Sequence, residues 1–141
     1  PASTGTLRRS KLHDVVVLAS NDVWVVGSAF SWQTFSTVPY FLRWNGQSWQ
    51  QGTIPSPPPG EFHGVTALSA TKVYAVGVKN FSQTLVARWN GSAWSQETTP
   101  SPSGSNDLVA ASAIGTGTVW GVGHRSDNGT LRTLTVRTTN G

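Results

Sequence analysis

The chain has 141 residues, of which 37% are hydrophobic and only 11% are charged; ten Lys and Arg against six Asp and Glu give a net charge of +4. It contains no cysteine, which excludes disulfides, thiolate metal sites and a cysteine nucleophile. The basic residues are scattered apart from Arg8, Arg9 and Lys11, so they do not form the basic stripe with interleaved aromatics that nucleic-acid binding requires.

The location of the protein is expected from what the sequence lacks. No apolar run approaches the roughly 20 residues of a membrane-spanning helix, and no signal-peptide pattern stands at Pro1. Methionine is absent, so Pro1 is not an initiator. We therefore expect a processed, secreted segment that acts outside the cell and has no membrane span.

The first unit of the chain is expected to contain four antiparallel strands, because Val, Thr, Trp and Ser are frequent and 15 Gly and 8 Pro punctuate them. We expect a long connection over 28–39 before the third strand and a stiff proline spacer over 55–60 after the fourth. The run 14–18 is almost wholly apolar and is expected to be buried on both faces. The expected strands are 14–18, 23–27, 40–44 and 47–51.

A hairpin is predicted within Arg43–Trp49, which returns almost unchanged as Arg88–Trp94. Asn-Gly tolerates the positive φ of a type I′ turn, so a two-residue loop at Asn45-Gly46 is expected. Leu42 would then face Trp49 across the ladder, and the tryptophans of each hairpin would be diagonal neighbours on one sheet face. Such large aromatics are expected to pack between sheets.

Two further units repeat this order. The second ends in a Pro100-Ser101-Pro102 spacer, and the third stops at Asn140-Gly141 without a fourth strand. The expected strands of these units are 64–68, 73–77, 84–89 and 92–96, followed by 108–112, 119–123 and 131–138.

The repeat period predicts the fold class. An aromatic recurs in the second strand at Trp24, Tyr74 and Trp120, a period of about 45 to 50 residues. Four strands within that period are what a β-propeller blade needs, and radially stacked blades bury both sheet faces. We predict an all-β, single β-propeller segment over 1–141, with blades at about 12–54, 61–99 and 106–141. A β-sandwich is the alternative.

The sequence also resembles a known repeat. Asp22–Gly27, followed by Arg43–Trp49 and a Pro-Ser-Pro spacer, is similar to a repeat of bacterial secreted proteins in which "DVWAVG" precedes "WdGxxW" and a proline pair. The resemblance covers 12–141 and implies propeller blades without implying an activity. A distant similarity to the Asp-box hairpin of sialidase-like propellers is confined to Gly46–Trp49 and Gly91–Trp94.

Three blades do not close a ring, since natural propellers have roughly four to eight. The expected partners are therefore the remaining blades of a longer chain or other copies of this one. Two copies would give six blades, and 1–10 could pair with the incomplete third blade of a neighbour.

The ionisable residues predict no catalytic machinery, cofactor or metal site. No pair of carboxylates is placed by sequence at glycosidase separation, and no Ser, His and Asp set surrounds a nucleophile elbow. No spacing matches a metal-binding rule. Asp22 and the run Asp127-Asn128-Gly129 are interpreted as turn formers.

Candidate ligand-binding residues are instead expected on one edge of the molecule, where the longer loops and the unit-to-unit connections emerge together. His13 and His63 precede the first strands of their units at matching positions, where the third unit has Asp107 or Leu108. Aromatic loop residues beside polar groups can stack a sugar ring. The candidates are Trp32, Phe35, Tyr40, His13, His63, Glu61 and Phe81.

These observations predict a non-catalytic extracellular binding or scaffold module, lectin-like, with carbohydrate as the first ligand class to test. One alternative is the non-catalytic portion of a secreted hydrolase. Another is a structural, self-assembling protein that is completed by strand docking between copies.

Overall fold

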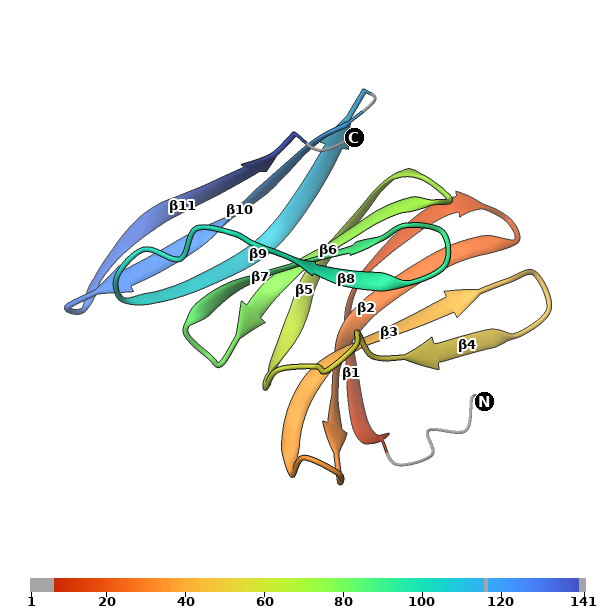
Figure 1. The fold of residues 1–141 in the computed structure, drawn as a ribbon, viewed down its shortest axis with the longest axis horizontal. Coiled ribbons are helices and arrows are strands. Elements are labelled where there is room, and N and C mark those ends of the chain that lie inside the picture. Colours follow the sequence, from red (N-terminus) through yellow and green to blue (C-terminus); the bar gives the residue numbers. More distant parts are fainter. Residues whose placement is uncertain (1–6, 116, 140–141) are drawn as a thin grey trace.

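The computed structural model describes residues 7–115 and 117–139. The structure is all-β, with 71% of the described residues in strands, and the strands form three antiparallel sheets of four, four and three strands (Figure 1). Within the described residues, no helix has the length and apolar character needed to cross a bilayer.

Each sheet is a simple meander in which consecutive strands are hydrogen-bonded neighbours. The first sheet contains β1 Leu7–Ala19, β2 Asp22–Ser31, β3 Ser36–Trp44 and β4 Trp49–Gly52. The second contains β5 Gly60–Ser69, β6 Lys72–Lys79, β7 Gln83–Trp89 and β8 Trp94–Glu97. The third contains β9 Ser105–Ile114, β10 Thr118–Asp127 and β11 Thr130–Thr138.

The three sheets stack face to face in chain order, with the second sheet in the middle (Figure 1). We call the face that a sheet turns toward the next sheet in the chain its front, and the opposite face its back. Because side chains alternate along a strand, β6 sends Val73 and Ala75 back toward the first sheet and Tyr74 and Val76 forward toward the third. The middle sheet is therefore buried on both faces.

The first seam joins the front of the first sheet to the back of the second. Trp24 and Val26 of β2 are fully buried there, together with Phe62, Trp94 and Ile54. Trp24 meets the edge of Trp94, with ring centroids 5.4 Å apart. Arg43 lies over Trp24, its Cζ 4.8 Å from the ring, and its Nε donates a hydrogen bond to Asp22 Oδ1 over 3.0 Å.

The second seam repeats this arrangement one unit later. Tyr74 and Val76 on the front of the second sheet pack with Leu108, Val119 and Leu134 on the back of the third. The aromatic residue of the second strand again faces an arginine across the ladder, because Tyr74 pairs with Arg88 as Trp24 pairs with Arg43. The two seams are thus built from the same repeat positions.

The two-residue hairpin predicted at Asn45-Gly46 is wrong. The loop has four residues, and Trp44 pairs directly with Trp49 across the ladder, as Trp89 does with Trp94. The side chain of Asn45 accepts hydrogen bonds from the amides of Gln47 and Ser48, so it replaces the tighter turn. A two-residue Asn-Gly turn with both φ angles positive does occur, at Asn128-Gly129.

Two other strand predictions differ from the structure, and part of the predicted docking segment is itself a strand. The run 14–18 is not buried on both faces, because Val15 and Val17 are exposed. The long connection over 28–39 is mostly strand, and only 32–35 form the turn. Leu7–Ser10, part of the predicted docking segment 1–10, belongs to β1. Residues 1–6 and the predicted turn at 140–141 lie outside the described residues.

The first strand of each sheet carries a bulge, and a glycine lies opposite it. The register of β1 against β2 shifts between Leu12 and Asp14, and that of β5 against β6 shifts between Phe62 and Gly64. A side chain on Gly27 or Gly77 would overlap the backbone carbonyl of the facing strand, which is why this position is glycine. The bulge re-aims one side chain in each strand.

Candidate functional site

The residues at the first two bulges are His13 and His63, the histidines expected at matching positions. Neither histidine has a partner in its ladder. His13 follows Leu12, which pairs with Gly27, and His63 follows Phe62, which pairs with Gly77. The imidazole of His13 reaches the second sheet, where it contacts the carbonyl of Phe62, and the imidazole of His63 reaches Asp107 of the third sheet. Their ring centroids lie 5.4 Å apart.

The third sheet does not place Asp107 or Leu108 at the matching position. Its register shifts between Leu108 and Ala110, so the residue at the bulge is Val109. Asp107 corresponds instead to Glu61, since each lies two residues before its bulge. The sequence prediction missed this because a bulge displaces the alignment by one residue and leaves no composition signal.

His13 is oriented by the neighbouring sheet. Its Nδ1 lies 2.6 Å from the carbonyl oxygen of Phe62, and because a carbonyl can only accept, this nitrogen carries the proton. The other ring nitrogen, Nε2, is therefore the one available to bind, and it lies 3.9 Å from Glu61 Oε2. Asp14 strengthens the same seam by accepting a hydrogen bond from the amide of Val65 over 2.9 Å.

His63 is oriented in the same manner by the third sheet. Its Nδ1 donates to Asp107 Oδ1 over 2.9 Å, and its Nε2 lies 3.3 Å from Glu61 Oε1. The hydrogen bond to Asp107 is the main cause that raises the pKa of His63 from 6.5 to about 9. The negative charges of Asp107 and Glu61 and the hydrogen bond to Glu61 add to this, whereas burial lowers the pKa.

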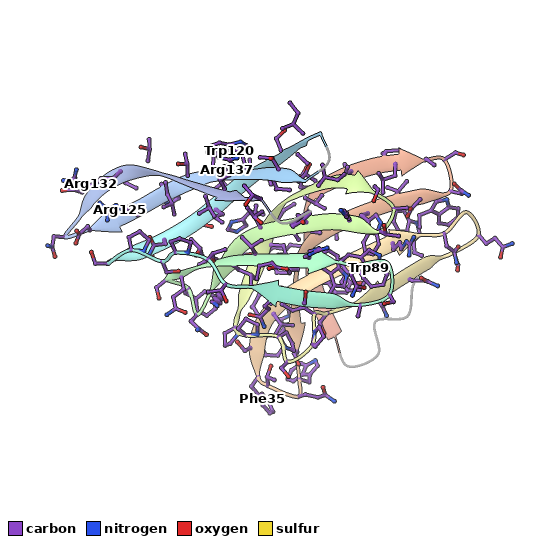
Figure 2. All side chains as sticks on the ribbon, turned by 45° about the horizontal axis from the view of Figure 1, so that its top comes forward. Phe35, Trp89, Trp120, Arg125, Arg132 and Arg137 are labelled. Atoms are coloured by element: carbon purple, nitrogen blue, oxygen red, sulfur yellow. The ribbon has the colours of Figure 1, made fainter. Side chains whose placement is uncertain are left out.

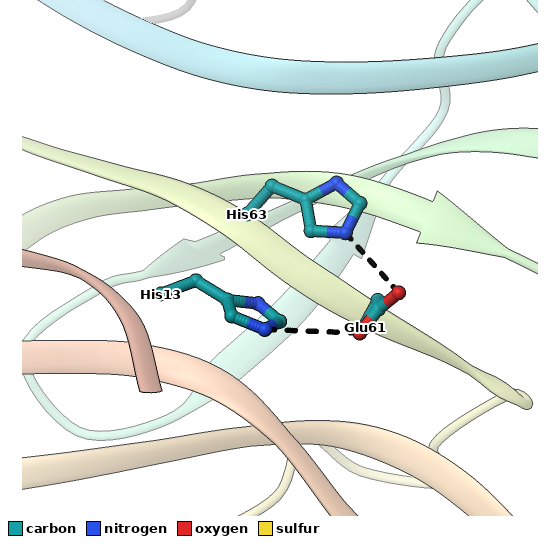
Figure 3. Close-up of side chains that lie close together, drawn as sticks. All are labelled: His13, Glu61 and His63. Atoms are coloured by element: carbon teal, nitrogen blue, oxygen red, sulfur yellow. Dashed lines mark ion pairs between the residues drawn. The ribbon is translucent and has the colours of Figure 1, made fainter. Parts of the chain in front are cut away.

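Together His13, Glu61 and His63 form a compact cluster, in which the two imidazoles lie beside each other and each faces a different carboxylate oxygen of Glu61 (Figure 3). One ligand atom from each residue lies within 4.8 Å of the other two. The three side chains are between 20% and 32% exposed, so the cluster is reached from solvent. Two imidazole nitrogens and a carboxylate are a donor set that can hold a divalent transition metal.

Three of the aromatic candidates are exposed at the loop edge. Trp32 and Phe35 lie in the turn between β2 and β3, and Phe81 lies in the matching turn between β6 and β7. Phe35 projects beyond the tip of its hairpin (Figure 2). The amide of Asn80 donates to the carbonyl of Pro59, so this turn and a unit-to-unit connection do emerge at the same edge.

Tyr40 lies elsewhere. It is 2% exposed, burial raises the pKa of its phenol, and its hydroxyl donates to Gln51 Oε1 over 2.8 Å on the back of the first sheet. Of the seven candidates, the structure therefore brings His13, Glu61 and His63 together, leaves Trp32, Phe35 and Phe81 as exposed loop residues, and buries Tyr40.

The two outer sheet faces expose apolar side chains that the sequence analysis did not single out residue by residue. The back of the first sheet exposes Leu12, Val15, Val17 and Trp49, although the strand pattern resembles that of a buried sheet. The front of the third sheet exposes Trp120 and Val122 (Figure 2). The sequence repeat could have indicated these faces, because residues at the same repeat positions are buried in the two internal seams.

Comparisons with known proteins supply no family: no family model, curated protein or solved structure matches the chain.

Proposed function

We propose that this chain is an extracellular scaffold module of the β-propeller type, which extends its stack by adding the sheets of a second copy to its open faces. The observation that carries this proposal is that the outer faces expose the same repeat positions that the internal seams bury. The module would act by binding and not by catalysis.

The front of the third sheet is one half of an unfilled seam. Trp120 is 44% exposed, whereas its counterparts Trp24 and Tyr74 are 0% and 1% exposed beneath the next sheet. Val122 is exposed as well, although Val26 and Val76 at the same position are buried. Arg137 lies across from Trp120, with its Cζ 5.8 Å from the ring, so the aromatic and arginine pair of the internal seams is already in place.

The back of the first sheet is the other half. Trp49 is 42% exposed, whereas Trp94 at the same position in the second sheet is 4% exposed and lies against Trp24. Val15 is exposed, whereas its counterpart Val65 is buried in the first seam. A second copy that places this back face on Trp120 would therefore reproduce the contact that the chain makes at its first seam.

The two half seams differ from one another, so the contact is heterologous and runs from the front of one copy to the back of the next. Repeated contacts of this kind close into a ring or continue as a filament, according to the rotation between copies. The driving force is apolar area removed from water, about 25 cal/mol per Å². A ring of two copies would contain six sheets, a number within the range of natural propellers.

Sedimentation equilibrium of the chain across a wide concentration range tests the proposal. We expect the mass to rise from one copy to two or more, and Val17→Glu or Val122→Glu to abolish the rise, because each places a charge in a seam. Both side chains are exposed, so the monomer should stay folded. Ser20→Glu, in the exposed turn between β1 and β2, is the control. A wild-type chain that remains monomeric at all concentrations contradicts the proposal.

A second candidate function, carbohydrate binding at the loop edge, is supported by the backbone of two turns. Phe35 and Phe81 are 75% and 60% exposed, and both have positive φ angles, 50° and 56°. A bulky residue at positive φ is strained, and strain concentrates at ligand-binding sites. Trp32 meets Phe35 edge to face, with ring centroids 6.1 Å apart.

A glycan array followed by titration calorimetry tests this candidate. We expect a bound sugar whose affinity falls at least about tenfold in Trp32→Ala and Phe35→Ala, since stacking on an exposed ring is lost. Leu131→Ala, an exposed apolar residue of the third sheet, is the matched control. Absence of any glycan signal, or equal losses in the control, argues against a lectin. The sedimentation result above is independent of this outcome.

A further inference from the structure

The cluster at the first seam is organised as a ligand set and not simply as an ion pair. In both His13 and His63 the Nδ1 is occupied by an acceptor, Phe62 carbonyl in one and Asp107 carboxylate in the other. Both Nε2 atoms are left to face Glu61. Metal-bound histidines show this arrangement, with one ring nitrogen on the ion and the other donating to a carbonyl or carboxylate.

We infer that His13, Glu61 and His63 bind one divalent transition-metal ion of the Zn²⁺ class across the seam between the first and second sheets. Asp107 of the third sheet acts as a positioning residue, since it fixes the tautomer and the direction of His63. Three protein ligands leave one coordination position open to water or to a donor atom of a ligand.

The distances fit such an ion after a small contraction. Ligand atoms held at about 2.0–2.2 Å from one tetrahedral ion lie roughly 3.4 Å apart. The Nε2 of His63 already lies 3.3 Å from Glu61, and the Nε2 of His13 lies 3.9 Å from it. No pair of the three ligand atoms exceeds 4.8 Å, and the Glu61 side chain is 32% exposed.

The ligands come from two sheets, so the ion would connect them. His13 lies on β1, Glu61 and His63 lie on β5, and the positioning carboxylate of Asp107 lies on β9. Both histidines lie at β-bulges, where the register of the first strand shifts against the second. Two bulged histidines beside one carboxylate are a more specific feature than an ordinary solvent-exposed ion pair, which needs only one partner of each sign.

Titration of the untagged chain, first dialysed against EDTA, tests the inference. With Zn²⁺ in the calorimeter we expect one ion per chain, and with Co²⁺ we expect the intense visible absorption of a four-coordinate site. His13→Gln, Glu61→Gln and His63→Gln should each weaken binding at least about tenfold, because each removes one of three ligands. Asp107→Asn should weaken it by about 10-fold to 100-fold through His63.

Glu97→Gln is the matched control, because Glu97 lies on β8 and is not part of the cluster. Its affinity should equal that of the wild type. X-ray absorption of the zinc-loaded wild type needs no variant and should report two imidazole ligands with oxygen donors. Azide should shift the Co²⁺ spectrum by taking the open position. Absence of stoichiometric binding, a zinc spectrum without two imidazoles, or an equal loss in Glu97→Gln overturns the inference.

Discussion

At the residue scale, the chain places its few ionisable groups where they connect sheets. Asp14 accepts a hydrogen bond from the amide of Val65. His13 donates to the carbonyl of Phe62, and His63 donates to the carboxylate of Asp107. Each bond joins residues at least 44 positions apart. The sequence showed that the histidines occupy matching positions, but not that they converge on Glu61, because convergence depends on two bulges that leave no sequence period.

The pKa of His63 is expected to depend on Asp107. In metal-free protein we predict a pKa of about 9 for His63 and a fall toward its ordinary 6.5 in Asp107→Asn, since the main cause of the rise is lost. Because the folded-state pKa exceeds the unfolded one, this contribution to stability is complete below about pH 6.5 and is lost as pH rises through about 9.

NMR titration of the imidazole signals in the presence of EDTA measures this pKa. Glu97→Gln is the control, because it removes a carboxylate of β8 that has no bond to His63. An unchanged His63 pKa in Asp107→Asn would contradict the assignment of the hydrogen bond. Chemical denaturation of the wild type at pH 6 and pH 10 measures the corresponding change in stability.

At the element scale, the strand order of each sheet follows from the repeat, whereas the details of pairing do not. The unit order, the proline connections and the lack of a fourth strand after β11 among the described residues were all predictable from sequence. The hairpin register was not, because the Asn45 side chain competes with the two-residue turn for the same amides. The bulges could not be predicted from the sequence either, although the sequence does show the glycine that lies opposite each of them.

The bulge glycine is predicted to be indispensable. Gly123→Ala should destabilise the fold by at least about 1 to 3 kcal/mol, because the new methyl group would overlap the backbone carbonyl of Asp107 and cannot move aside. Gly121→Ala, two residues earlier on the same strand, should be neutral or stabilise by about 0.5 to 1 kcal/mol. Its methyl group would meet Leu108 at an ordinary 3.5 Å, and Ala75 stands at that position in the second sheet.

Urea denaturation of the two variants beside the wild type measures both effects. The account requires Gly123→Ala to be much less stable than Gly121→Ala. Equal free energies of unfolding for the two variants would contradict the close approach of β9 and β10 at the bulge. The matching bulge at His63 could then no longer be used to explain the position of that side chain.

At the scale of the whole molecule, the stack has a direction. Each sheet carries an aromatic residue and an arginine on its front, the backs of the second and third sheets pack on the fronts of the sheets before them, and the back of the first sheet and the front of the third expose apolar side chains. Apolar faces of this kind on a protein with 11% charged residues are a liability unless they bind something. The repeat period predicted that the units stack. Only the packing in the two seams shows that the front of one sheet contacts the back of the next.

Mixing two single variants tests the direction of the stack most directly. Val17→Glu blocks the back of the first sheet and Val122→Glu blocks the front of the third, so neither variant should associate alone. An equimolar mixture retains one intact front and one intact back, and its mass in sedimentation equilibrium should rise to two copies and stop there. A mixture that stays monomeric while the wild type associates, or a single variant that dimerises alone, would contradict front-to-back stacking.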